Sequence, residues 1–143
     1  MIISHTLEQY QESNVVLGKK EENYNNKNNY YIKINYFDGF VSLNSLSFVL
    51  SFKNMVLMSM YNYTKINFNV SNNIDIIKTI QEIEENLLRH VNKQPKFSLY
   101  SILAKGFIKV PTQQCCKKVV ILRIYGIWES HDLCGLKYKF LVY

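Results

Sequence analysis

The alternation of apolar and polar residues is strongest in the C-terminal stretch 117–143. Two runs with a period of two, 119–128 and 136–143, flank the polar segment Glu129-Ser130-His131-Asp132. Because a period of two places successive side chains on opposite faces of a β-sheet, this stretch is predicted to form a long hairpin. Lys137 and Lys139 are expected on one face of its second strand, opposite an apolar face. One face of the first strand is expected to hold Val120, Leu122, Ile124, Gly126 and Trp128.

Shorter alternating runs predict further strands upstream of this hairpin. The segment 30–37 (YYIKINYF) alternates along its whole length, and Asp38-Gly39 is a turn signal directly after it. Segments 46–53 and 55–63 are predicted to pair as a hairpin around Lys53-Asn54. Other strands are expected at 40–43 and 65–70, and 97–110 is expected to form one strand or two short ones around Lys105-Gly106.

The first 29 residues are predicted to differ from this array of strands. Residues 1–17 are expected to form an arm or a short strand packed on the main body. Residues 18–29 (GKKEENYNNKNN) have the composition of a polar loop. The predicted organisation is therefore an N-terminal arm and loop, 1–29, followed by one domain, 30–143.

One amphipathic helix is predicted between the middle and late strands. Ser71 to Asn73 carry short polar side chains that favour a helix start, and Pro95 is expected to end the helix. Strands before and after a single helix predict a mainly β fold, a β-barrel like the OB-fold, which binds oligonucleotides. An α+β sandwich is the alternative. The apolar face predicted for the helix, residues 74–92, consists of Ile76, Ile77, Ile80, Ile83, Leu87, Leu88 and Val91.

The positive charge of the chain is concentrated at its C-terminal end. Residues 96–143 hold eight basic and two acidic residues, whereas residues 1–95 hold nine of each, so the whole net charge of +6 lies in the last third. A basic surface attracts polyanions, whereas the simpler interpretation is a solvated face. The absence of a long apolar run predicts no membrane-spanning segment. Three cysteines and no secretory signal predict a reducing, intracellular location.

No pattern in the sequence indicates catalysis, a metal or a cofactor. His5, His90 and His131 are scattered, and no glycine-rich phosphate loop is present. Cys115-Cys116 lacks the spacing of a zinc site, and we interpret the pair His131 and Cys134 as turn and core residues. The chain is therefore predicted not to be an enzyme, with no catalytic residue, metal site or cofactor.

Basic and aromatic residues are interleaved at strand spacing, which is typical of surfaces that bind single-stranded nucleic acid. Tyr31 with Lys33, Tyr63 with Lys65, and Arg123 with Tyr125 are each two residues apart and share a strand face. The alternative for each residue alone is that the ring packs and the lysine extends along it into solvent. Trp128 is either a stacking platform or a core residue, and Tyr138 is expected in the core. The predicted nucleic-acid contacts are Tyr31, Lys33, Lys105, Phe107, Lys109, Arg123, Tyr125, Trp128, Lys137 and Lys139.

The last third of the chain resembles a known family at these same residues. The pattern LRIYGIWES, a short turn and GLKYKF (122–140), preceded by GFIKVP (106–111), resembles the single-stranded DNA-binding proteins of large DNA viruses of eukaryotes. The resemblance implies an OB-fold and a role in viral DNA replication or recombination, in the host nucleus or at a viral replication site.

The predicted partner is thus single-stranded nucleic acid, with DNA favoured over RNA, and a homo-oligomer is possible. The alternative function is a structural or protein-interaction module, such as a virion component, in which the apolar terminal strand pairs with another subunit through its open edge.

Overall fold

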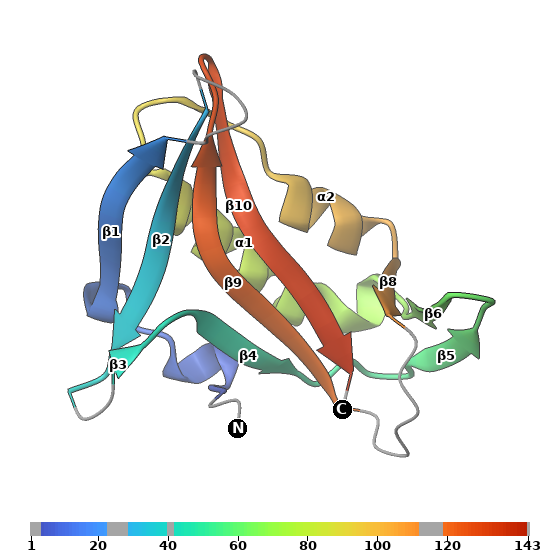
Figure 1. The fold of residues 1–143 in the computed structure, drawn as a ribbon. Coiled ribbons are helices and arrows are strands. Elements are labelled where there is room, and N and C mark those ends of the chain that lie inside the picture. The colour runs from blue at the N-terminus through green and yellow to red at the C-terminus, as the bar shows by residue number, and fades with distance from the viewer. Residues whose placement is uncertain (1–3, 23–28, 40–41, 112–118, 143) are drawn as a thin grey trace.

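The computed structural model describes residues 4–22, 29–39, 42–111 and 119–142. Within these ranges the fold contains two sheets and two α-helices (Figure 1). Cys115 and Cys116 lie outside the described residues. The large sheet contains β1 (Val15–Glu22), β2 (Tyr30–Phe37), β3 (Ser42–Leu43), β4 (Leu46–Leu50), β7 (Gln94–Pro95), β9 (Val120–Glu129) and β10 (Leu133–Val142). The small sheet contains β5 (Val56–Ser59), β6 (Tyr63–Asn67) and β8 (Phe107–Pro111). The helices are α1 (Ile74–Leu88) and α2 (Ser98–Ala104), with 3₁₀ turns at Leu7–Gln9, Glu12–Asn14 and Ser71–Asn73.

The large sheet curls because β9 exchanges partners along one edge. β4 pairs with Val120–Ile124, whereas β2 pairs with Gly126–Glu129. Tyr125 lies between these two ladders, and it is also the extra residue where the register with β10 shifts. A β-bulge bends its strand and increases the local twist. The large sheet curls into a half-barrel, and it bends at this point. Figure 1 shows β9 and β10 as two long strands that curve in front of the helices.

Both helices cover the inner face of the large sheet, where the apolar core lies (Figure 1). Ile77, Ile80 and Ile83 of α1 are buried among the inward side chains of β2, β4, β9 and β10. A buried carboxylate joins the helices, because Glu84 of α1 accepts hydrogen bonds from the backbone N–H groups of Leu99 and Tyr100, both at 3.0 Å. These bonds satisfy N–H groups in the first turn of α2, which have no partner within the helix.

The start of α1 is held by the buried Asn73. Its side chain accepts a hydrogen bond from the N–H of Lys53 (2.7 Å) and donates to the carbonyl oxygens of Lys53 (3.1 Å) and Asn69 (2.8 Å). The predicted polar start at 71–73 is thus present, and its last residue also fixes the connection between β4 and β5.

The fold class predicted from the sequence is confirmed as mainly β and barrel-like, with the amphipathic helix between middle and late strands. The terminal hairpin, the strand at 30–37 and a short return strand are also confirmed. α1 ends at Leu88, before the predicted Asn92, and Pro95 lies in the short strand β7 beyond it. Among the described residues no helix combines the length and apolar character needed to cross a membrane.

Three predictions of local structure were wrong. Segments 46–53 and 55–63 do not pair, because β4 joins β9 in the large sheet and β5 pairs with β6 in the small one. Residues 98–104 form a helix, since Leu99 and Leu103 are four apart and bury one helical face. The predicted loop begins later than expected, because residues 18–22 continue β1, which pairs with β2.

The described part of the N-terminal segment packs on the main body. His5 forms an isolated bridge to Phe48 beside β4. Tyr10 stacks on Tyr36, with ring centroids 6.3 Å apart, and its hydroxyl donates to Asn86 Oδ1 (3.0 Å). Burial is the largest cause that raises the pKa of Tyr10 to about 12.

Candidate nucleic-acid interface

The face of the large sheet opposite the helices, called here the outer face, holds seven of the ten predicted contacts. On β2, Tyr31 and Lys33 alternate with the buried Ile32 and Ile34, so they point away from the core. The same alternation on β10 places its two lysines on the outer face between buried apolar residues. The seven outer-face residues are Tyr31, Lys33, Arg123, Tyr125, Trp128, Lys137 and Lys139.

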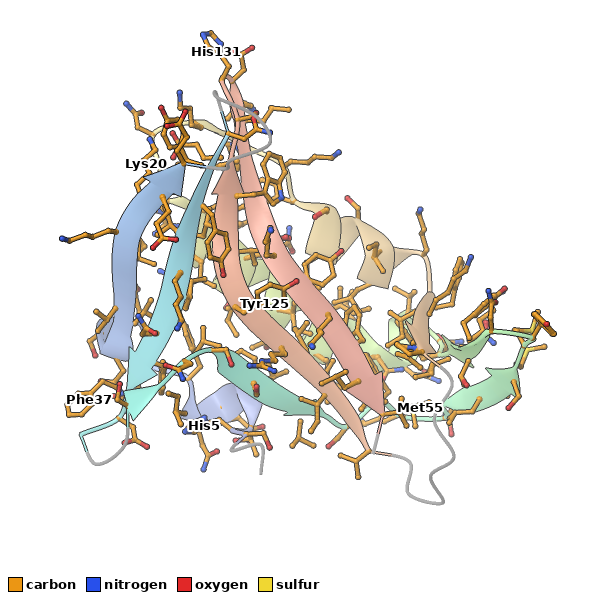
Figure 2. The ribbon with its side chains drawn as sticks, viewed as in Figure 1. His5, Lys20, Phe37, Met55, Tyr125 and His131 are labelled. Atoms are coloured by element: carbon orange, nitrogen blue, oxygen red, sulfur yellow. The ribbon has the colours of Figure 1, made fainter. Side chains whose placement is uncertain are left out.

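The bulge at Tyr125 reverses the predicted faces of the end of β9. Ile124 and Ile127 are both fully buried although they are three residues apart, so Trp128 lies on the outer face. The prediction that Trp128 shares a face with Val120 is therefore wrong, and its side chain is half-buried on the outside. Tyr125 is close enough to Tyr31 to contribute to the raised pKa of that phenol, after burial. Figure 2 shows Tyr125 midway along the β9–β10 pair.

Two aromatic rings lie across neighbouring strands on top of glycines. The indole of Trp128 covers Gly135, its register partner on β10, and a Cβ at Gly135 would lie 2.5 Å from Trp128 Cζ2. The phenol of Tyr31 covers Gly126 in the same way. The Tyr31 hydroxyl donates a hydrogen bond to the carbonyl oxygen of Tyr125 (2.9 Å), which fixes that ring against the bulge. Because these glycines have no side chain, the two rings can lie flat against the sheet.

Basic residues lie on the same face of the sheet as these rings. Lys137 Nζ lies 5.0 Å from the centroid of the Tyr31 ring, a cation–π distance. Arg123 and Lys139 are register partners on β9 and β10, so two like charges face each other. Arg123 Nε donates to Ser45 Oγ (3.1 Å), which orients the guanidinium. None of the ion pairs found among the described residues involves a basic residue of the outer face.

The two acidic residues of the basic C-terminal third lie elsewhere. Glu129 is buried on the inner face, where it pairs with Lys20 (2.6 Å) and lies 3.9 Å from Lys93. Asp132 is in the hairpin turn, 2.8 Å from His131, which Figure 2 shows at the tip. One carboxylate does lie beside the outer face, that of Glu21, the register partner of Tyr31 on β1, which also contributes to the raised pKa of Tyr31.

The other three predicted contacts, Lys105, Phe107 and Lys109, lie on a different part of the molecule. Lys105 is the C-cap of α2 rather than a strand residue, because the strand begins only at Phe107. Phe107 and Lys109 share a face of β8 with Tyr63 and Lys65 of the neighbouring β6. The structure therefore joins two separately predicted pairs on one face of the small sheet.

Sequence reasoning missed the residues that support the interface. Gly126 and Gly135 carry the rings, and Ser45 holds Arg123. The register of the predicted hairpin contained a signal for one of these, since a turn centred on 131–132 pairs residue 128 with residue 135. Nothing in the alternation indicated the bulge or the contact with Ser45.

Two further observations concern metal ligands and the thiol of Cys134. No group of three or more His, Cys, Asp and Glu side chains in the described ranges is placed to hold a metal ion. Burial, and then Glu129, raises the pKa of the Cys134 thiol, which disfavours the reactive thiolate.

Comparisons of the chain with protein-family models, curated proteins and solved structures found no match. The resemblance of residues 106–140 to viral single-stranded DNA-binding proteins therefore stays a prediction.

Proposed function

We propose that this protein binds single-stranded nucleic acid on the outer face of the large sheet, without catalysis and with little sequence preference. The observation that carries the proposal is the cluster of Trp128 and Tyr31, two rings seated on glycines, with Lys137 over one of them. Rings that lie on a sheet present a π-face to incoming bases, and every base has such a face.

The rings and the cations contact different parts of the nucleic acid. Each stacked base contributes about 1–3 kcal/mol, and the cations bind the phosphates that follow the strand. Lys33, Arg123, Lys137 and Lys139 supply four such charges beside the rings. The opposed pair Arg123 and Lys139 gains most, since a phosphate between two like charges removes their repulsion.

DNA is proposed as the natural ligand, and replication or recombination of a large DNA virus as the setting. Both parts of this proposal come from the resemblance of 106–140, since stacking and phosphate contacts are available to RNA as well. Recognition of the 2′-hydroxyl is what distinguishes the two polymers, so the comparison of matched DNA and RNA strands tests this part separately.

The testing experiment is a titration of a labelled single-stranded oligonucleotide, followed by anisotropy at two salt concentrations. For a single strand, the slope of log K against log salt is about −0.7 for each phosphate contacted, so four contacts give a slope of about −3. The variant K137E/K139E should abolish most of the binding, whereas K53E/K78E, which changes the net charge equally at exposed sites elsewhere, should not. A wild-type protein that does not bind at low salt would refute the proposal.

A second candidate, a protein-interaction module, is favoured by apolar side chains exposed around the β5–β6 hairpin. Val56 and Met58 on β5 and Met60 and Tyr61 in the turn are all exposed, and Tyr61 has no cover at all. Light scattering without nucleic acid tests this candidate. A defined oligomer that dissociates in the variant V56S/M58S would support it, and a monomer at all concentrations would exclude self-association.

A further inference from the structure

A hollow of about 440 Å³ lies between β8 of the small sheet and β10 of the large sheet. Its volume is within the range of about 300–1,000 Å³ typical of small-molecule sites. Three ammonium groups and several apolar or aromatic side chains line it, with no acidic residue among them. The lining residues are Ile102, Lys105, Phe107, Ile108, Lys109, Pro111, Tyr138, Lys139 and Phe140.

The hollow exists because two strand edges approach without pairing. β8 pairs with β6 on one side, and β10 pairs with β9 along its length and with β7 only at Leu133 and Cys134. In the described ladders the facing edges of β8 and β10 have no register with each other. Gly106, with φ of +84°, turns the chain sharply between α2 and β8 and brings Lys105 to the rim.

Lys139 connects the hollow to the outer face. It lines the hollow, and it is also the register partner of Arg123 on the outer face of the large sheet. A phosphate bound at Lys139 would therefore be shared by the two surfaces.

The small sheet carries a second set of paired rings and cations on the far side of the hollow. Lys65 Nζ lies 4.4 Å from the centroid of the Phe107 ring, and Lys109 Nζ lies 5.1 Å from that of Tyr63. Lys65 and Lys109 are themselves direct register partners. Like charges placed opposite each other destabilise a sheet, and the ion pairs found among the described residues include neither lysine. A bound polyanion would offset this repulsion.

We infer that the outer face, the hollow and the small sheet form one continuous track for a single strand of nucleic acid. The strand stacks on the rings of the large sheet, passes Lys139 into the hollow between β8 and β10, and continues over Lys109 and Lys65. This inference rests on the proposed function and adds its footprint: short oligonucleotides fill the outer face, and longer ones also engage the small sheet.

A series of oligonucleotide lengths tests the track. With about 16 nucleotides, K65E/K109E should weaken binding by about tenfold or more, and with about 4 nucleotides by less than about twofold, because only the longer strand reaches the small sheet. K53E/K78E is the control of equal charge change. Equal weakening at both lengths, or none with the longer strand, would overturn the track while leaving the proposed function intact. Failure of the wild type to bind either length would refute the proposed function itself.

Crosslinking provides a measurement that does not depend on how the variants fold. A 16-nucleotide strand carrying 5-iododeoxyuridine at one end or the other is irradiated with the wild-type protein. The track predicts crosslinks to Tyr31 or Trp128 from one end and to Tyr63 or Phe107 from the other. Crosslinks confined to the large sheet, or a dimer whose interface covers Lys65 and Lys109, would overturn it.

Discussion

The ring of Tyr31 lies directly on Gly126 of the neighbouring strand, so that no side chain larger than hydrogen fits beneath it. The same phenol donates a hydrogen bond to the carbonyl oxygen of Tyr125, the residue of the bulge. The position of the Tyr31 ring on β2 thus depends on the bulge at which β9 changes partners. The curl of the sheet and the proposed stacking surface therefore have the same structural origin.

Alanine at Gly126 should lift the Tyr31 ring off the sheet. Overpacking of this kind costs about 1–3 kcal/mol of unfolding free energy. Loss of nucleic-acid affinity should accompany it, because the ring no longer lies flat. Chemical denaturation and anisotropy measure the two effects. G18A is the matched control, since its Cβ would meet Lys33 only at van der Waals distances from 3.4 Å. If G126A were as stable as G18A and bound equally well, the packing of Tyr31 on Gly126 would have no role in stability or binding.

The contributions of the ring and the hydroxyl of Tyr31 can be measured separately. Y31F loses only the bond to the Tyr125 carbonyl, with an expected cost of about 0.5–1.5 kcal/mol in stability and little change in affinity. Y31A removes the platform, and binding should weaken by about 1–3 kcal/mol, the contribution of one stacked base. The comparison of both variants by titration separates the effects. Equal affinities of Y31A and Y31F would show that no base stacks there.

The buried Asn73 should matter for stability and not for binding. N73A removes three hydrogen bonds at the start of α1, two to Lys53 in the loop after β4 and one to Asn69, and it leaves the N–H of Lys53 without its partner. An unfolding free energy lower by about 2–4 kcal/mol is expected from those losses. Thermal denaturation measures it. N72A, at an exposed neighbour, should change stability little, and a similar loss in both variants would contradict the assignment.

Glu84 should make stability depend on pH. Burial is the main cause that raises the pKa of its carboxyl above the ordinary value of 4.5, and the two backbone N–H bonds only partly oppose this. A raised pKa in the folded state means that the stabilising contribution is fully present below about pH 4.5 and is lost as pH rises through the folded pKa. The stability of wild type relative to E84Q should therefore fall as pH rises. Urea unfolding across that range measures the difference, and parallel curves would contradict it.

Much of the fold was predictable because period-two alternation determines both faces of a regular strand. This pattern was sufficient for 30–37 and for the terminal hairpin, and it correctly assigned Lys137 and Lys139 to a common outer face. It failed at Trp128, since one extra residue at Tyr125 exchanges the two faces and leaves no mark in the alternation. It also failed at 98–104, where a short apolar run suits either a strand or a helix.

The candidate site was predictable within single strands but not between them. Spacing alone placed Tyr63 with Lys65, and Phe107 with Lys109, on common faces. The pairing of β6 with β8 could not be predicted in this way. The two strands are separated in sequence by α1 and α2, so their pairing depends on tertiary packing. The hollow at Lys139 likewise arises from two strand edges that are distant in sequence.

The intrinsic fluorescence of Trp128 tests the central claim most directly, because it is the only tryptophan in the sequence and its indole is one of the two rings of the proposed stacking surface. Single-stranded oligonucleotide is added at low salt while binding is followed independently by anisotropy. Stacking of a base on the indole should quench the emission in proportion to binding, with saturation at the same ratio. Binding that leaves the emission of Trp128 unchanged would contradict the claim that the outer face of the large sheet receives the bases.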